Sequence, residues 1–260
     1  MFHALFKLLQ LQPENSFFSW EHCVYDWMRL GLFTGFRVSE YGQNKLRRGE
    51  KFRTLPSTPD VPSAQRGKPV AFIITDFVFY DCDHRQVPYR DVWTSLLQGK
   101  LRLLEITWRY DKSPTNFSVR KFFVTRDPIF CPVSAAASII HRAILLGVPP
   151  DEPIGVWSTN GSTYRFVKDK DVAFVLRVSV LAAFPDPDHF MRQHISQVVP
   201  HSNRVTAAVC LKQGGVSNDD IAFRLRWSPM SVPTYLRDCF TAVGDMLQKT
   251  LYGAMALSFN

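Results

Sequence analysis

The chain has 260 residues, 46% of them hydrophobic, which is enough to bury a sizeable core in one large domain or two small ones. The composition therefore excludes a disordered protein. A net charge of +8, from 31 basic and 23 acidic residues, favours a polyanionic partner such as nucleic acid, because lysine and arginine release counterions when they neutralise phosphates. A basic protein without such a partner is the alternative interpretation.

Cysteine usage and hydropathy favour a soluble intracellular protein. The five cysteines are scattered and form no CxxC pair, which indicates reduced thiols rather than a disulfide framework. The segment Asp81–His84 contains potential metal ligands, but no second group completes a ligand set, so we interpret it as a solvated turn and predict no metal site. The longest apolar segment, Val172–Phe184, contains Arg177 and is too short to span a bilayer, so no membrane partner is expected.

A helix is predicted near the start of the chain, at residues 19–33. Ser19 can cap this helix, and apolar side chains repeat at helical spacing between Val24 and Leu30. The pair Thr34–Gly35 should end it, because glycine readily adopts the backbone conformation that stops a helix. A second helix should begin near Ser39.

Three strands are predicted before Pro132. Residues 70–80 are rich in β-branched and aromatic side chains, and residues 101–110 alternate between apolar and polar side chains. The turn sequence DKSPTN separates 101–110 from a short strand at 119–125, so the tip of a hairpin carries Lys112. After Pro132 the sequence predicts helices at 133–147, about 169–183, 204–214, 217–226 and 232–250. The expected fold is a mostly helical α+β domain with a small three-stranded antiparallel sheet.

Two short segments contain side chains suited to binding a phosphate. In TGFRVSE, Gly35 interrupts the chain just before Arg37, so the guanidinium can project from the start of a helix into a cleft. In HSNRVTAA, His201 and Arg204 are three residues apart and share one face of a helix. Arginine offers a planar fork of donors to two phosphate oxygens, and histidine adds a donor or a proton relay. The opposite side of this helix should be buried through Val205, Ala208, Val209 and Leu211. Taken alone, each segment is more simply a surface arginine or a chance pairing.

A third segment, RLRWSPMSVPTYLRD, contains two aromatic residues of interest. Trp227 precedes Tyr235 by eight residues, with a Ser-Pro turn between them. Ser231 can cap a new helix, and Pro233 fits its first turn, where a missing N–H costs little. Tyr235 should therefore lie at the start of a helix among polar neighbours, although a core position for both aromatic residues is the alternative.

The order of these residues resembles that of the tyrosine recombinases, the phage-integrase family. The resemblance extends over residues 17 to 245, and the segments HSNRVTAA and RWSPMSVPTYLRD are most similar to the crypton and DIRS-type branch of eukaryotic mobile elements. That branch has tryptophan where bacterial members commonly have histidine. Three positions depart from its pattern, since Asn203 replaces a usual leucine, Thr206 a common glycine, and Leu225 an expected glycine. The residues that carry the resemblance are Arg37, Lys112, His201, Arg204, Trp227 and Tyr235.

The resemblance implies a site-specific DNA recombinase or integrase that cleaves and rejoins DNA through a 3′-phosphotyrosine. It implies that Tyr235 is the nucleophile and Lys112 the general acid, and that no cofactor or metal is needed. Glu40 would hold an active-site side chain in place. The remaining catalytic positions, which would stabilise the transition state, are Arg37, His201, Arg204 and Trp227.

The same resemblance sets expectations for domains, partners and localisation. Residues 17–260 would form the catalytic domain, with 1–16 a remnant or linker and the family's N-terminal core-binding domain absent. Double-stranded DNA is the expected partner, with self-association on DNA. The apolar tail 243–257 would either dock on a neighbouring subunit or pack on the chain's own core. The expected localisation is intracellular, and nuclear if the host is eukaryotic. A basic stretch should grip DNA through Lys45, Arg47, Arg48, Lys51 and Arg53.

Three alternatives remain open at the level of sequence. One is a catalytically inactive DNA-binding relic of a mobile element. Another is an enzyme similar to type IB topoisomerases, which nicks and reseals one duplex, although the Trp227 signature fits mobile-element recombinases better. The third is an unrelated basic helical protein.

Overall fold

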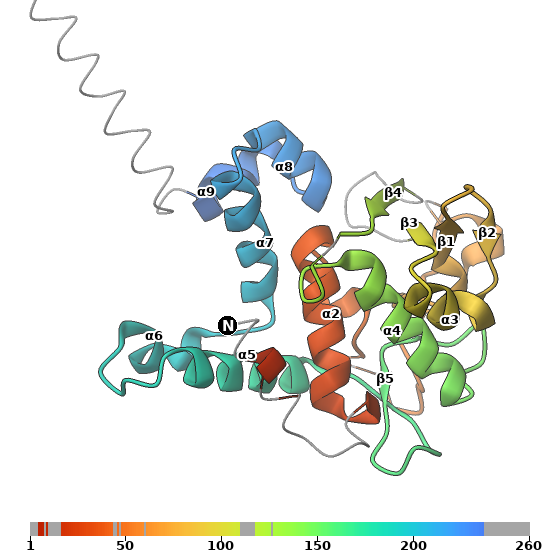
Figure 1. Ribbon diagram of the computed structural model, residues 1–260, viewed down its shortest axis with the longest axis horizontal. Coiled ribbons are helices and arrows are strands. Elements are labelled where there is room, and N and C mark those ends of the chain that lie inside the picture. Colours follow the sequence, from red (N-terminus) through yellow and green to blue (C-terminus); the bar gives the residue numbers. More distant parts are fainter. Residues whose placement is uncertain are drawn as a thin grey trace, which may run out of the picture.

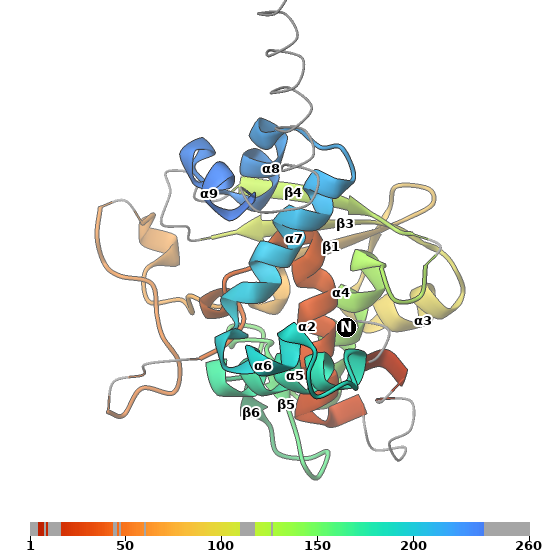
Figure 2. The same cartoon turned by 90° about the vertical axis from the view of Figure 1, so that its left-hand side faces the viewer.

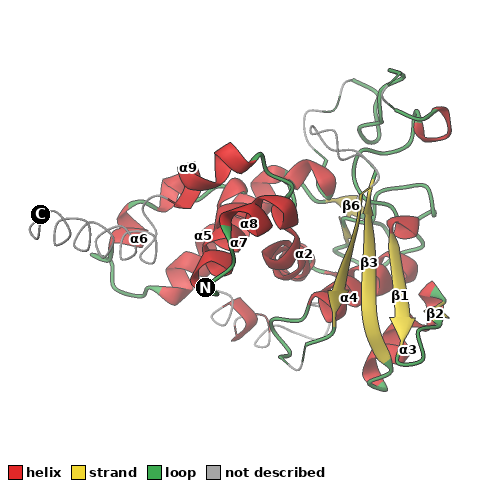
Figure 3. Cartoon of the chain, turned by 90° about the horizontal axis from the view of Figure 1, so that it is seen from above, coloured by secondary structure: helices red, strands yellow, loops and turns green. Residues whose placement is uncertain are grey.

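The computed structural model describes residues 5–7, 9, 17–43, 46, 48–59, 61–109, 118–125 and 127–236. It has a mixed α+β fold, as the sequence predicts, but about half of it is helical rather than most of it. Helix α2 (Trp20–Thr34) runs through the middle of the molecule, with α4 (Pro132–Leu145) and the sheet on one side and α7 (His201–Gln213) on the other (Figure 1). The view from above in Figure 3 shows the same arrangement, with α2 between α7 and the α4 layer.

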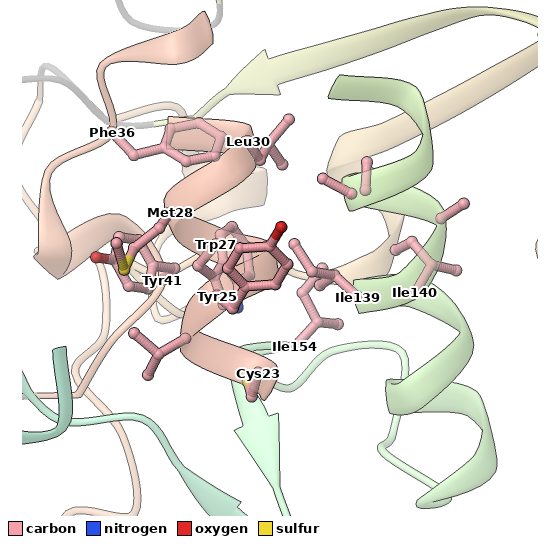
Figure 4. Packing of buried hydrophobic residues seen from close by; sticks show 14 of the residues in the cluster. Cys23, Tyr25, Trp27, Met28, Leu30, Phe36, Tyr41, Ile139, Ile140 and Ile154 are labelled. Atoms are coloured by element: carbon pink, nitrogen blue, oxygen red, sulfur yellow. The ribbon is translucent and has the colours of Figure 1, made fainter. Parts of the chain in front are cut away.

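Helix α2 begins and ends where the sequence predicts. The Ser19 hydroxyl accepts a hydrogen bond from the His22 backbone N–H at 3.2 Å, and Gly35 ends the helix in the left-handed conformation, with φ of +60°. Most side chains of α2 are buried, and they form the centre of the main core together with α4, whose Ile139 points toward α2 (Figure 4).

A buried ion-pair network also joins α2 to α4. Asp26 accepts hydrogen bonds from Arg142 at 2.6 Å and from Arg29 at 3.3 Å. Arg29 donates further to the carbonyls of Pro128 and Ile129, just before α4 begins. These polar contacts fix the two helices in register, because a buried charge is tolerated only with its partners in place.

The main sheet is antiparallel and has four strands in the order β2-β1-β3-β4, one more than predicted. Its strands are β1 (Phe77–Asp81), β2 (Gln86–Val87), β3 (Leu101–Trp108) and β4 (Ser118–Phe123). The predicted hairpin is confirmed, since β3 pairs with β4 from Leu103↔Phe123 to Trp108↔Ser118. The strand predicted for 70–80 begins only at Phe77, because Ile74–Asp76 forms a 3₁₀ turn in which the Asp76 carboxylate accepts from the Ile73 N–H.

The second half of the chain is helical except for one small hairpin. The predicted helices at 133–147, 169–183 and 217–226 are confirmed within two residues at each end, and α7 begins three residues before its predicted start. The hairpin of β5 (Val156–Trp157) and β6 (Arg165–Phe166) was not predicted, because two-residue strands leave no periodicity to detect. The helix predicted for 232–250 lies outside the described residues beyond 236. The other helices are α3 (Val92–Leu97), α5 (Asp169–Ala183), α6 (Phe190–Gln193), α8 (Asn218–Leu225) and α9 (Val232–Leu236).

Helices α7, α8 and α9 enclose a second, small core. It contains Ala207, Ala208, Ile221, Ala222, Leu225, Val232 and Leu236. The buried face of α7 differs from the prediction, because Asn203 and Arg204 are buried beside Ala207 and Ala208 whereas Val205, Val209 and Leu211 are only partly buried. The reason is close contact with α2, where Asn203 Nδ2 donates to the Met28 carbonyl and where a Cβ on Gly31 would lie 2.5 Å from that nitrogen.

Two features bear on the expected domain limits and partners. Leu5 and Leu9, within the segment expected to be a remnant or linker, are buried in the main core. Among the described helices, none is both long and apolar enough to cross a membrane.

Candidate functional site

The end of α2 is where the distant segments of the sequence meet. Gly35 packs against Leu225 at the end of α8, so closely that a Cβ on Gly35 would lie 2.7 Å from a Leu225 methyl group. This contact places Arg37, which follows Gly35, beside Arg226 and Trp227, which follow Leu225. Figure 2 shows α7, α8 and α9 gathered at this end of α2, with α5, β5 and β6 at the opposite end.

Glu40 joins the two segments. It lies at the end of the 3₁₀ helix Val38–Glu40 and is buried. Its carboxylate accepts from the two terminal guanidinium nitrogens of Arg226, at 2.8 and 3.0 Å, and from the Arg37 backbone N–H at 3.0 Å. The Arg37 Nη1 lies 3.5 Å from the same carboxylate. A bidentate arginine–carboxylate pair fixes direction as well as distance, so Glu40 orients Arg226 and anchors the backbone of Arg37.

Arg226 is the residue of this site whose contribution the sequence analysis missed. Its side chain is fully buried, and its guanidinium lies 4.5 Å from the centre of the Trp108 ring at the end of β3. Its φ of +58° is unusual for a residue other than glycine. Such a conformation costs on the order of 1–3 kcal/mol and persists only where the surroundings enforce it. Adjacency to Trp227 was the only signal in the sequence.

Helix α7 brings its predicted pair to the same place. Arg204 is 4% exposed; its Nη2 donates to the Leu225 carbonyl at 2.7 Å, and its guanidinium lies 5.3 Å from the centre of the Trp227 ring. His201 is exposed one turn earlier. The pKa of His201 is nevertheless lowered below its ordinary value. The main cause is that part of the residue is shielded from water, and the positive charges of Arg204 and Arg37 add to it. The structure therefore brings together the predicted Arg37, His201, Arg204 and Trp227.

Strand β4 extends the positively charged region. The Arg120 guanidinium lies 4.2 Å from the Phe223 ring centre, and that of Arg224 lies 4.2 Å from the Phe122 ring centre, so two cation–π contacts join β4 to α8. Burial, followed by the positive charge of Arg226, lowers the pKa of Arg120. The end of β3 and the first half of β4 therefore lie beside a cluster of charged and aromatic residues. We call it the arginine cluster, and it consists of Arg37, Glu40, His201, Arg204, Arg226 and Trp227.

Several predicted residues are not placed by the structure. Lys112, Lys45 and Arg47 lie outside the described residues. The backbone of Tyr235 lies in α9, but its side chain is outside what is described. Helix α9 packs on α7 and α8 through Val232 and Leu236, so the chain at Tyr235 shares the small core that also positions Arg204.

The described part of the predicted DNA-binding stretch is exposed. Arg48, Lys51 and Arg53 all lie on the surface. Lys51 has a local partner, since its Nζ is 2.6 Å from a carboxylate oxygen of Glu152 and 3.4 Å from the Tyr164 hydroxyl. These three side chains remain predicted DNA contacts.

In chemical terms, the arginine cluster offers guanidinium, imidazole and indole N–H groups close together. Donors of this kind match the oxygens of a phosphate better than an apolar or cationic ligand. Within the described residues, no group of three or more His, Cys, Asp or Glu side chains is placed to hold a metal ion. A scan against protein-family models and a search of curated proteins found no match to this chain.

Proposed function

We propose that this chain cleaves and rejoins DNA through a 3′-phosphotyrosine formed on Tyr235. One observation carries the proposal: Arg37, His201, Arg204 and Trp227 come from three distant stretches of the chain yet surround the same end of α2. Packing alone does not require arginine, histidine and tryptophan at these positions. A phosphodiester ligand would explain them, because its transition state gathers negative charge on the nonbridging oxygens.

Each residue of the cluster then has a role. Arg37 and Arg204 bind the nonbridging oxygens, while His201 and the Trp227 indole N–H supply further donors. Donors aimed in advance at the developing charge contribute on the order of 3–4 kcal/mol each in a site that excludes water. Glu40 and Arg226 position the cluster without contacting the DNA, since both are buried and bonded to each other.

The proposed reaction conserves the energy of the broken bond. The Tyr235 hydroxyl loses its proton to solvent as its oxygen attacks phosphorus, and the 5′ oxygen of the next nucleotide leaves with a proton from Lys112. Rejoining is the reverse, with a 5′-hydroxyl attacking the phosphotyrosine and returning the proton. The hairpin that carries Lys112 has its ends at Trp108 and Ser118, and Trp108 contacts Arg226 in the cluster. This short connection supports the role proposed for Lys112.

A suicide substrate tests the proposal directly. DNA oligonucleotides with a 5′-bridging phosphorothiolate trap the covalent intermediate, because the thiol that leaves cannot attack back. The wild-type chain should form a protein–DNA adduct that survives denaturation, and Tyr235→Phe should form none. Tyr80→Phe is the matched control, because the Tyr80 hydroxyl bonds to Glu105 in the sheet and should not affect the yield.

The other outcomes separate the alternatives. A chain that shifts DNA in a native gel but forms no adduct is a DNA-binding relic. An adduct that relaxes supercoiled plasmid without exchanging strands between duplexes indicates an activity like that of type IB topoisomerases. An adduct equally abundant in Tyr235→Phe, or no binding of DNA at all, contradicts the proposal.

A further inference from the structure

A cavity of about 480 Å³ lies at the opposite end of α2 from the arginine cluster. Trp20 at the start of α2, the β5–β6 hairpin and the start of α5 form its walls. Helix α2 has 15 residues and rises 1.5 Å per residue, so roughly 20 Å separates Trp20 from the end of α2 beside the cluster. Gln43, three residues after Glu40, lines the part of the cavity nearest the cluster. The volume is typical of small-molecule sites, and the proposed DNA cleavage makes no use of it.

Aromatic side chains supply the apolar part of the lining. Trp20, Trp157 and Phe166 all face the cavity. None of the three is fully buried, so their rings retain surface that a ligand can cover. Flat ligands such as nucleobases stack on rings of this kind.

Basic side chains supply the charged part. Lys51, Arg165, Lys168 and Lys170 line the cavity, against the single carboxylate of Asp171. Asp171 accepts a hydrogen bond from the Lys168 backbone N–H at 2.9 Å, so it caps the start of α5. No ion pair among the described residues involves Arg165, Lys168 or Lys170. The cavity therefore has an excess of positive charge that suits a phosphate.

Two buried hydrogen-bond donors in the lining point to a ligand independently of charge. Gln43 is 3% exposed, and its Oε1 accepts from the Arg53 backbone N–H at 3.0 Å, which assigns the other terminal atom as the nitrogen. That Nε2 and the Trp157 Nε1 are both buried without a hydrogen-bond partner among the described residues. A buried donor without a partner is unfavourable. Both nitrogens have almost no accessible surface, so the acceptor atoms of a ligand reach them once the neighbouring lining side chains shift.

We propose that this cavity binds a nucleotide. The base would lie against the aromatic rings with its acceptor atoms near Gln43 and Trp157, and the phosphate would contact Lys168 and Lys170. A nucleotide is the ligand class that combines a flat ring, acceptor atoms and a negative charge in one small molecule. The same chemistry is available from a free nucleotide and from an unpaired nucleotide of a DNA strand. The inference does not depend on phosphotyrosine chemistry.

Calorimetric titration of the full chain with deoxyadenosine 5′-monophosphate tests this. Binding should be tighter than that of deoxyadenosine or inorganic phosphate alone. Lys170→Ala should weaken it about tenfold or more, the amount expected for a hydrogen bond to a charged group. Lys100→Ala removes an equally exposed lysine elsewhere and should leave the affinity unchanged. Trp157→Phe keeps a ring but removes the N–H, so affinity should fall roughly two- to tenfold.

A second titration identifies the source of the nucleotide. If an eight-nucleotide single strand of deoxyadenosine binds tighter than the mononucleotide, and is equally sensitive to Lys170→Ala, the nucleotide belongs to a DNA strand. Equal affinities assign the cavity to a free nucleotide. Lys100→Ala, outside the cavity, should change neither affinity. The proposal is overturned if neither probe binds, if inorganic phosphate or deoxyadenosine binds as well as the nucleotide, or if Lys170→Ala and Trp157→Phe have no effect.

Discussion

Arg109 and Arg226 are both buried arginines that contact a carboxylate, but their surroundings differ in charge. The Arg109 Nε donates to both oxygens of Asp76, at 2.7 and 2.9 Å, and its other nitrogens donate to the carbonyls of Pro69 and Ala71. Every nitrogen of this guanidinium has an acceptor, and one carboxylate balances one cation. The contacts hold the loop before β1 against the end of β3.

The arginine cluster concentrates positive charge instead. Glu40 is shared between Arg226 and Arg37, and the positive charges of Arg37 and Arg204 lower the pKa of His201. Repulsion between like charges costs folding free energy, whereas a balanced pair such as Arg109–Asp76 avoids that cost. The comparison suggests that the first site serves the fold and that the second serves an anionic ligand. Substitutions at the two sites should therefore have different consequences.

Arginine-to-lysine substitutions should give the largest difference between the arginine cluster and the Arg109 site. In Arg204→Lys, the planar fork becomes a single ammonium group, so the rate of covalent adduct formation should fall about 100- to 1,000-fold, the amount seen when one transition-state donor is lost. In Arg109→Lys, the charge beside Asp76 remains but the planar fork is lost, so the buried carbonyls of Pro69 and Ala71 lose their donors and stability should fall by about 1–3 kcal/mol for each. Single-turnover cleavage of the phosphorothiolate substrate and urea unfolding measure the two quantities.

The pattern of the results decides the comparison. Under conditions where it is folded, Arg109→Lys should form the adduct at the wild-type rate. If Arg204→Lys loses stability as much as Arg109→Lys and cleaves at the normal rate, both arginines are structural and the distinction is wrong.

The parts of the fold that sequence predicted are those controlled by local pattern. Ser19 and Gly35 bound α2 because capping and left-handed glycine act within one turn of the helix. The alternation of β3 predicted the hairpin with β4 because the buried face repeats every second residue. The Arg109–Asp76 pair and the β5–β6 hairpin were missed, since the first spans 33 residues and the second has two-residue strands.

The candidate site also has features that the sequence predicted and features that it did not. Residue types and their order identified Arg37, His201, Arg204 and Trp227, and the structure brings these four together. The role of Arg226 could not be predicted, because it depends on a positive φ and on contacts to Glu40 and Trp108 from other parts of the chain. Burial of Arg204 was also missed, because apolar periodicity alone placed the inner face of α7 on its valines.

Two glycine substitutions test whether the backbone contact between α2 and α8 constrains the arginine cluster. Gly35 and Gly147 have nearly the same φ, +60° and +63°, but only Gly35 has a side chain packed against the position of a Cβ. Alanine should cost about 1–2 kcal/mol at either position through the left-handed conformation. Gly35→Ala should lose about 1–3 kcal/mol more, because its methyl group collides with Leu225. Urea unfolding of the two variants measures the difference, and equal losses would show that the α2–α8 contact does not constrain the cluster.

The smallest expected effect concerns the pKa of His201, which reports directly on the charge around it. Burial and the charges of Arg204 and Arg37 lower this pKa from 6.5, so the unfolded chain binds more protons between the folded pKa and 6.5. The free energy of unfolding should therefore fall as the pH drops through that window, and His201→Gln should remove this part of the slope. Arg37→Gln should raise the pKa of His201 in an NMR titration, whereas Arg85→Gln, on the distant β1–β2 turn, should not change it.

Binding of an anion is a second test of the positive charge around His201. A phosphodiester bound between Arg37 and Arg204 would offset their positive charges and stabilise the imidazolium, so DNA should raise the pKa of His201 in the Tyr235→Phe chain, which cannot react. The Arg37→Gln substitution and the bound anion should shift the pKa in the same direction for the same reason. If the pKa of His201 rises with Arg37→Gln but does not respond to DNA, the positive charges act on His201 as described and the DNA binds elsewhere.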